Sequence, residues 1–170
     1  MPILEVQFQF MKKQIEDSIK DCDWSKTISA QHIEIPICYD PSLAPDLFKL
    51  AEERKLAPEI VVHLHSGKPY RVYMIGFLPG FAYMGKVDER ITMPRKNNPS
   101  IEVPAGSVGI AGEQTGIYPV NSPGGWNIIG QTPMRLFDAR NNDPVLLKAG
   151  DEVQFVPITL QQFHDLKSKL

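Results

Sequence analysis

Residues 103–130 read VPAGSVGIAGEQTGIYPVNSPGGWNIIG and contain three short apolar runs separated by glycine and proline turns. These runs are 107–111, 116–120 and 126–129. Many short apolar runs between such turns are typical of a β-barrel or a β-sandwich. The pattern continues on both sides, with further strands predicted at 70–77, 134–137 and 153–156. The sequence therefore predicts a mainly β domain between about Pro69 and Pro157.

Helical patterns flank this β region. All 12 glycines lie at or after Gly67, and the glycine-free part before it has apolar residues spaced four apart. Two such sets predict helices: Met11, Ile15 and Ile19, then Leu43, Leu47 and Ala51. Pro58 suits the first position of a third helix, because its fixed φ is already helical. A last helix is predicted after Thr159, which can form a capping box with Gln162.

Two smaller patterns also concern strands. Ile33, Ile35 and Ile37 alternate with other residues, which predicts a half-buried strand. Pro36 places this strand at a sheet edge, since proline has no N–H to donate to a ladder. Glycines recur every third residue at 106, 109 and 112, which is typical of a strand that packs closely against another backbone.

Composition excludes several classes of function. The 170 residues carry 18 basic and 20 acidic side chains, a formal net charge of -2, without the basic footprint that nucleic acid requires. The apolar runs fall far short of the ~20 residues that cross a bilayer, and the charges from Glu5 onward do not fit a signal peptide. Cys22 and Cys38 offer neither a disulfide framework nor zinc spacing. We therefore expect a cytoplasmic protein with no nucleic-acid, membrane or metal partner.

The segment from Val103 to Phe137 is poor in groups that transfer protons. It has one acid, Glu113, and one base, Arg135, but many amide, hydroxyl and backbone N–H groups on glycine turns. Such a segment suits the binding of a neutral polar ligand better than acid–base chemistry; alternatively, its polar turns only shape a barrel. Gly80 to Lys86 matches a phosphate-binding loop except at its last position, where Val87 replaces the required Ser or Thr. We therefore expect no nucleotide at this loop.

Several longer motifs occur in order along the chain. They are GFLPGFAYMG (76–85), PR (94–95), VPAGSVGIAG (103–112), QTGIYP (114–119), SPGGW (122–126) and GxTP (130–133). Together they resemble the family of the 5-oxoprolinase B subunit, which includes the sporulation kinase inhibitor KipI and is often labelled allophanate hydrolase subunit 1. The resemblance extends from about Glu34 to Phe163, which is most of the chain.

The resemblance implies a cyclophilin-like β-barrel with flanking helices, preceded by a smaller α/β domain. Only about 30 residues precede the strand at Ile33, too few for that whole domain. We therefore expect residues 1–30 to be a shortened remnant of the N-terminal domain or a linker helix, and residues 31–170 to be the cyclophilin-like domain.

The function that the resemblance implies is that of the B subunit in an ATP-dependent 5-oxoprolinase. This lactam hydrolase converts 5-oxoproline to glutamate at a site formed with the C subunit. It is inactive without its partner subunits, which also include the A subunit. ATP is expected to bind to the assembled complex and not to this chain alone.

The same resemblance implies a set of binding or catalytic residues, within which we assign the catalytic roles to His65, Gln114 and Tyr118. Substrate-binding roles are assigned to Thr115, Ser122, Gly124, Gly125 and Trp126. We expect Gln114 and Ser122 to hydrogen-bond the lactam or its phosphorylated form, and Trp126 with Tyr118 to form an apolar wall. For His65, as for the nearby His63, packing or local hydrogen bonding is an alternative role.

Other functions remain compatible with the sequence. A KipI-like inhibitor would block the autophosphorylation of a sensor histidine kinase and would dock through aromatic and proline side chains, which commonly anchor interfaces. The candidates for this docking are Phe77, Pro79, Phe81 and Tyr83. A role within a urea- or allophanate-type amidohydrolase or carboxyltransferase is another alternative. Proline isomerisation, suggested by similarity to cyclophilin, is the weakest because fold does not establish function.

Overall fold

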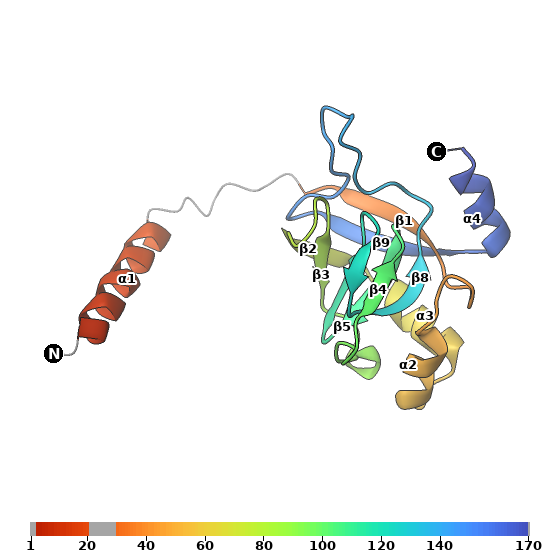
Figure 1. Cartoon of the computed structure of the whole chain (residues 1–170), viewed down its shortest axis with the longest axis horizontal. Coiled ribbons are helices and arrows are strands. Elements are labelled where there is room, and N and C mark those ends of the chain that lie inside the picture. Colours follow the sequence, from red (N-terminus) through yellow and green to blue (C-terminus); the bar gives the residue numbers. More distant parts are fainter. Residues whose placement is uncertain (1–2, 21–29, 170) are drawn as a thin grey trace.

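The computed structural model describes residues 3–20 and 30–169, in which seven strands close into a barrel in the order β1-β8-β5-β6-β3-β2-β9 (Figure 1). The barrel strands are β1 (His32–Cys38), β2 (Tyr70–Ile75), β3 (Ala82–Gly85), β5 (Ser107–Ala111), β6 (Gln114–Ile117), β8 (Asn127–Gln131) and β9 (Glu152–Ile158). A separate two-stranded sheet contains β4 (Ser100–Val103) and β7 (Ser122–Gly124). The predicted mainly β barrel with flanking helices is confirmed.

The pairing of β1 closes the barrel. β1 pairs in parallel with β9 along its whole length, from His32↔Glu152 to Cys38↔Ile158. On its other side it pairs with β8 only at Cys38↔Gln131. Pro36 therefore lies where β1 has a strand on one side only, which accommodates a residue without an N–H. We expected β1 at a sheet edge. It is instead a barrel strand, paired along its whole length with β9 and only at Cys38 with β8.

Four α-helices and one 3₁₀ turn complete the described part of the chain. They are α1 (Ile3–Lys20), α2 (Leu47–Glu53), α3 (Pro58–Ser66), η1 (Glu89–Ile91) and α4 (Leu160–Lys167). In Figure 1, α2 and α3 lie together at one end of the barrel. Pro58 opens α3, and Thr159 caps α4 through the predicted capping box with Gln162. The apolar side chains of α1 are exposed, as at Met11. The division of the chain into two parts at about residue 30 remains a prediction.

Two expectations about elements need correction, and one barrel strand, β3, was not predicted. Residues 134–137 form a loop with a single bridge, Phe137↔Val145, because no neighbouring strand continues the ladder there within the described residues. Leu43 lies in a turn before α2 and not within that helix. Residues 82–85 form β3, because β2 and β6 pair with this short segment on both sides.

Cys38 is buried and free, whereas Cys22 lies outside the described residues.

Two hydrophobic clusters divide the interior. The larger cluster fills the barrel and includes Ile35, Val72, Met84, Ile117 and Phe155. The smaller cluster lies outside the barrel wall, where the β4–β7 sheet covers it. Its buried members are Phe81, Val103, Ala111, Tyr118, Trp126 and Ile128. Residues from four separate sequence motifs meet in this smaller cluster, which therefore positions the candidate site.

The predicted close packing at the repeated glycines is confirmed at two of the three positions. A Cβ on Gly106 would lie 2.4 Å from the carbonyl oxygen of Thr132, and one on Gly109 would lie 3.0 Å from the Cβ of Trp126. A Cβ on Gly112 would meet nothing within 4 Å among the described residues. Gly106 and Gly112 both have positive φ, +83° and +60°, which strains residues with a Cβ.

This contrast predicts different costs for two alanine substitutions. Gly112→Ala should lower the free energy of unfolding by about 1 kcal/mol, since only left-handed backbone strain is added. Gly106→Ala should lower it by about 3 kcal/mol or more, because the methyl group also displaces the Thr132 carbonyl. Urea unfolding followed by circular dichroism measures both. Equal losses in the two variants would contradict the close approach at Gly106.

Candidate functional site

An aromatic pocket of about 260 Å³ lies over the smaller hydrophobic cluster. It is lined by Phe77, Tyr83, Arg95, Pro99, Tyr118, Pro123, Gly124, Gly125 and Trp126. Four of these are predicted substrate or catalytic residues, Tyr118, Gly124, Gly125 and Trp126, and two, Phe77 and Tyr83, are predicted partner contacts. The fold thus brings together residues that are up to 49 positions apart in the sequence, from 77 to 126.

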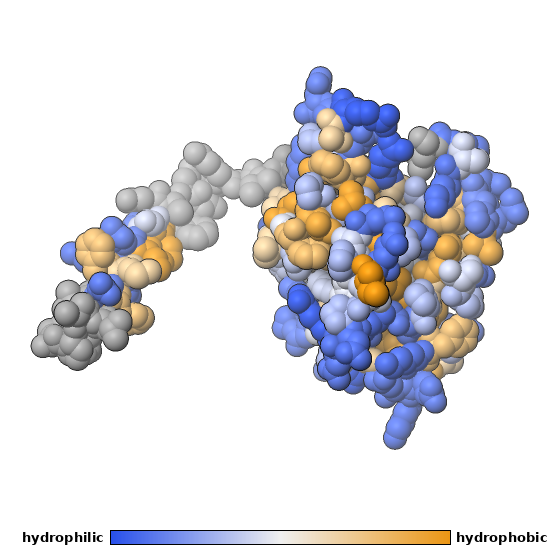
Figure 2. Space-filling view, viewed as in Figure 1, coloured by the Kyte–Doolittle hydropathy of each residue, from blue (hydrophilic) through white to orange (hydrophobic). Residues whose placement is uncertain are grey.

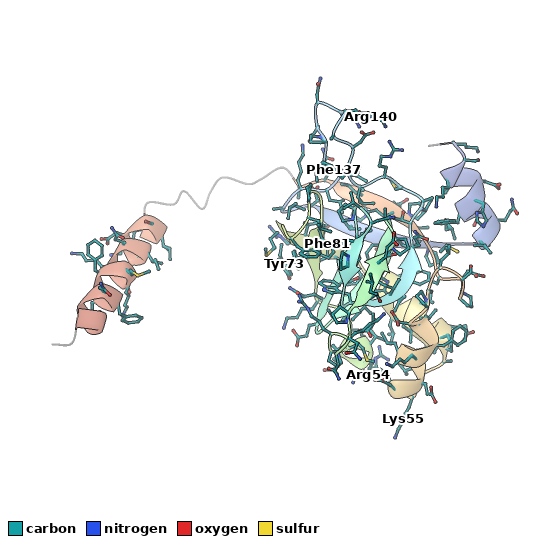
Figure 3. The ribbon with its side chains drawn as sticks, viewed as in Figure 1. Arg54, Lys55, Tyr73, Phe81, Phe137 and Arg140 are labelled. Carbon is teal, nitrogen blue, oxygen red and sulfur yellow. The ribbon has the colours of Figure 1, made fainter. Side chains whose placement is uncertain are left out.

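Phe81 supports this pocket from beneath. Its ring makes edge-to-face contacts with Tyr118 and Trp126, with centroids 5.2 and 5.3 Å apart, and with Phe77 at 5.7 Å. Such edge-to-face pairs are favourable because the positive ring edge meets the negative ring face. Phe81 is 1% exposed, so it offers no free surface to a partner. Phe77 and Pro79 are exposed and Tyr83 is half-buried; Figure 3 labels Phe81 and Tyr73 on this side of the barrel.

Tyr118, which is 1% exposed, lines the pocket and has a neutral hydroxyl. Burial raises the pKa of Tyr118, while a hydrogen bond from the backbone N–H of Trp126 and the charge of Arg95 act in the opposite direction. A Cβ on Gly124 would lie 2.3 Å from this hydroxyl oxygen, so only glycine fits at that position. At neutral pH Tyr118 is therefore protonated and can donate or accept a hydrogen bond, but it is not a base.

His65 and Thr115 lie elsewhere, inside the barrel. The Thr115 hydroxyl donates to the carbonyl oxygen of Gly109 (3.0 Å), so its oxygen accepts from Nε2 of His65 (2.9 Å). Nδ1 of His65 is then the unprotonated nitrogen and accepts from the Tyr39 hydroxyl (2.8 Å). Both imidazole nitrogens are therefore occupied by partners of the fold.

The surroundings of His65 keep it neutral. It is 0% exposed and stacks on Phe155 with ring centroids 4.7 Å apart. Burial lowers the pKa of His65 from 6.5 to about 3, because the charged form would lose its hydration. His63, two residues earlier on α3, is exposed. The arrangement of His65 is that of a core histidine with complete hydrogen bonding.

Gln114 and Ser122 lie outside the lining of the aromatic pocket. Gln114 is exposed at the start of β6, opposite Gly85 of β3. Ser122 is buried, and its hydroxyl has no hydrogen-bond partner within the described residues. The predicted set of eight site residues is thus divided: four line the pocket, two lie in the barrel, one is exposed and one is buried beside β7.

Arg95, Pro99 and Pro123 also line the pocket, although the sequence did not predict them there. Arg95 belongs to the short PR motif at 94–95, but nothing in the sequence connects that motif to Trp126. Arg95 also lines an adjoining polar pocket of about 520 Å³. In that pocket Lys96 forms an ion pair with Asp46, with Nζ and Oδ2 2.5 Å apart, and Asp46 also accepts from the Ile128 N–H.

Neither a metal site nor a membrane span is found in the residues that the structure covers. Over 3–20 and 30–169, no three His, Cys, Asp or Glu side chains are grouped so as to hold an ion. Over the same ranges no helix is both long and apolar enough to cross a bilayer. Gly80 to Lys86 leads into β3 and not into a helix, so this segment lacks the helix N-terminus that a phosphate-binding loop uses.

The burial of neutral His65 predicts a pH-dependent stability. Because its pKa is lower in the folded state than in the unfolded state, the unfolded chain binds the extra proton as pH falls below 6.5. The contribution is fully present above pH 6.5 and is lost towards pH 3. Between pH 6 and 5, this effect should lower the free energy of unfolding of the unmodified chain by about 1 kcal/mol per pH unit. The control His63→Ala, at an exposed position, should show the same dependence, whereas His65→Phe should lack it. Urea unfolding at several pH values measures these slopes, and identical slopes in all three proteins would refute the assignment.

Comparisons with known proteins identify the family of this chain. Residues 3–147 match the family model described as carboxyltransferase domain, subdomain C and D. The chain is 43% identical over 162 residues to the 5-oxoprolinase B subunit of Bacillus subtilis, covering 95% of this chain and 68% of the relative. It spans between 59% and 68% of the length of the curated relatives that it matches.

Solved structures show the same fold. A conserved uncharacterised protein from Pyrococcus horikoshii is 43% identical, with a TM-score of 0.75 over 94% of this chain and 70% of that one. The urea amidolyase of Kluyveromyces lactis superposes with a TM-score of 0.74 over 94% of this chain and 11% of that one, at 18% identity, so that likeness concerns the fold alone. From the family model and the curated relatives together, the chain belongs to the family of the 5-oxoprolinase B subunit, within the carboxyltransferase domain, subdomains C and D.

Proposed function

We propose that this chain supplies the substrate-binding half of an ATP-dependent 5-oxoprolinase site. The C subunit supplies the other half, and the A subunit takes part in the same complex. The overall reaction adds water across the lactam C–N bond of 5-oxoproline to give glutamate, at the expense of ATP. The curated relatives are themselves named as the B subunit of 5-oxoprolinase, which supports this assignment.

The composition of the aromatic pocket carries the proposal. Among the described residues, its lining has aromatic rings, prolines, glycines and one arginine, and no carboxylate or imidazole. Flat aromatic walls suit the compact lactam ring, and the neutral Tyr118 hydroxyl can hydrogen-bond its amide. Opening an amide also requires groups that take up and deliver protons, for which carboxylates and imidazoles are the usual choice, and the described lining has neither. Those groups must come from the companion chain.

The remaining predicted residues have different roles in this proposal. Gln114 is exposed on β6, outside the pocket, so we assign it to the face that meets the C subunit. Ser122 and Thr115 support the pocket and the barrel, and His65 holds the barrel interior through Tyr39 and Thr115. We assign ATP to the assembled complex and not to this chain alone. The run from Gly80 to Lys86 contains β3 and its turns, so it does not provide the helix N-terminus of a phosphate-binding loop.

Reconstitution with the A and C subunits tests the proposal through ATP-dependent release of glutamate from 5-oxoproline. Release should require all the chains. Trp126→Phe, which shrinks the pocket wall, should raise KM about 5- to 10-fold, the equivalent of about one aromatic contact. Phe48→Leu, at an exposed aromatic position on α2, is the matched control and should leave KM unchanged. Glutamate release by the isolated chain, or no effect of Trp126→Phe in an intact complex, would overturn the proposal.

Exposed apolar side chains beside the pocket support a second candidate, inhibition of a sensor histidine kinase. Tyr73, Met74 and Phe77 are 57%, 53% and 64% exposed, and Figure 2 shows hydrophobic colouring gathered around β2. Such a surface could dock on a partner helix or loop.

This candidate predicts that the chain alone lowers kinase autophosphorylation. Phe77→Ser should weaken that inhibition about tenfold, because it removes the most exposed aromatic anchor. Phosphate incorporation from labelled ATP measures the effect. Unchanged autophosphorylation at a large excess of the chain would eliminate kinase inhibition and leave the oxoprolinase proposal intact.

A further inference from the structure

Arg95 carries a charge that the fold does not neutralise. Of the six arginines, Arg90 pairs with Asp88, and Arg135 and Arg140 both pair with Asp138. Within residues 3–20 and 30–169, Arg95 makes neither an ion pair nor a hydrogen bond. The nearby carboxylate of Asp46 is already engaged by Lys96 and by the Ile128 N–H. The guanidinium of Arg95 therefore retains all its donors.

Its position beside the aromatic pocket distinguishes Arg95 from the other arginines without an ion pair among the described residues, Arg54 and Arg71. In the part of the chain that the structure describes, Arg95 is the only charged residue that lines the aromatic pocket. Its charge helps to offset the rise that burial causes in the pKa of Tyr118, so the guanidinium acts on the hydroxyl in the same pocket. Arg95 is exposed at the rim of the pocket, so a cation with free donors stands beside the aromatic walls and is accessible to an anionic ligand.

We propose that Arg95 binds the carboxylate of 5-oxoproline, and this inference rests on the proposed function. The substrate has two chemically distinct parts, a flat uncharged lactam ring and a carboxylate on the carbon next to the ring nitrogen. A guanidinium can hold a carboxylate through two parallel N–H···O bonds. The walls formed by Trp126 and Tyr118 then contact the ring.

This contact would determine both selectivity and orientation. A neutral lactam without the carboxylate lacks the ion pair and should bind more weakly, whereas 5-oxoproline satisfies the guanidinium and the aromatic walls together. Because the carboxylate is attached beside the ring nitrogen, fixing it at Arg95 also fixes where the scissile C–N bond lies. Arg95 is therefore a substrate-binding residue that directs the reacting bond towards the companion chain.

The test uses the assembled complex with 5-oxoproline and ATP. Arg95→Met should raise KM about 10- to 100-fold while kcat stays within about threefold, since a charge-assisted bidentate contact is lost. Arg95→Lys should give an intermediate KM, because lysine keeps the charge without the fork. Arg54→Met is the matched control: Arg54 is exposed on the C-cap of α2, away from the pocket lining, and is labelled in Figure 3.

A second readout separates binding from a merely structural role. The neutral lactam 2-pyrrolidinone, used as a competitive inhibitor, should keep its inhibition constant within about twofold in Arg95→Met, since no carboxylate contact is involved. Equal weakening of 2-pyrrolidinone and 5-oxoproline would overturn the inference, as would an unchanged KM in Arg95→Met while Trp126→Phe raises it. Both of these results leave the proposed function standing. Failure of the unmodified complex to release glutamate would instead overturn the proposed function.

Discussion

The parallel pairing of β1 with β9 is the constraint on which the rest of the structure depends. It joins residues 32–38 to residues 152–158, so the barrel closes only when two segments more than 100 positions apart meet. Phe155 enters the interior from β9 and stacks on His65, which arrives from α3. Closure thus also fixes the hydrogen-bonded chain from Tyr39 through His65 to Thr115. Such non-local pairing is costly in chain entropy, and a well-packed interior offsets that cost.

The structure separates residues that stabilise the fold from residues that can meet a ligand. Inside the barrel, polar groups satisfy one another, and both ring nitrogens of His65 have partners. Outside the barrel wall, Phe81 holds Tyr118 and Trp126 edge-on beneath an open pocket. Both regions contain aromatic and polar residues, so composition alone does not distinguish them. Their difference is topological, because the β4–β7 sheet adds a second layer over one part of the wall.

Local rules predicted much of the fold. Thr159 with Gln162, and Pro58 at a helix start, depend on neighbours within a few residues, and the glycine-separated apolar runs gave most of the barrel strands. The misses depend on distant partners: β3 is a strand because β2 and β6 flank it. At the site, Tyr118, Gly124, Gly125 and Trp126 line one pocket, while the roles assigned to them stay predictions. For His65, packing was one of the two roles that the sequence left open, and the structure shows it buried. The free charge of Arg95 was not predictable, because it depends on residues brought near by the tertiary fold.

The contact between Gly124 and Tyr118 makes the small sheet a mechanical part of the pocket. Gly124 pairs with Ser100 across β7 and β4, and even a methyl group would not fit between Gly124 and the tyrosine oxygen. The next residue of β4, Ile101, is 91% exposed. A contact made on the outer face of β4 at Ile101 would therefore lie one residue from the strand pair that holds Gly124 against the Tyr118 hydroxyl, which joins the molecular surface to the candidate pocket.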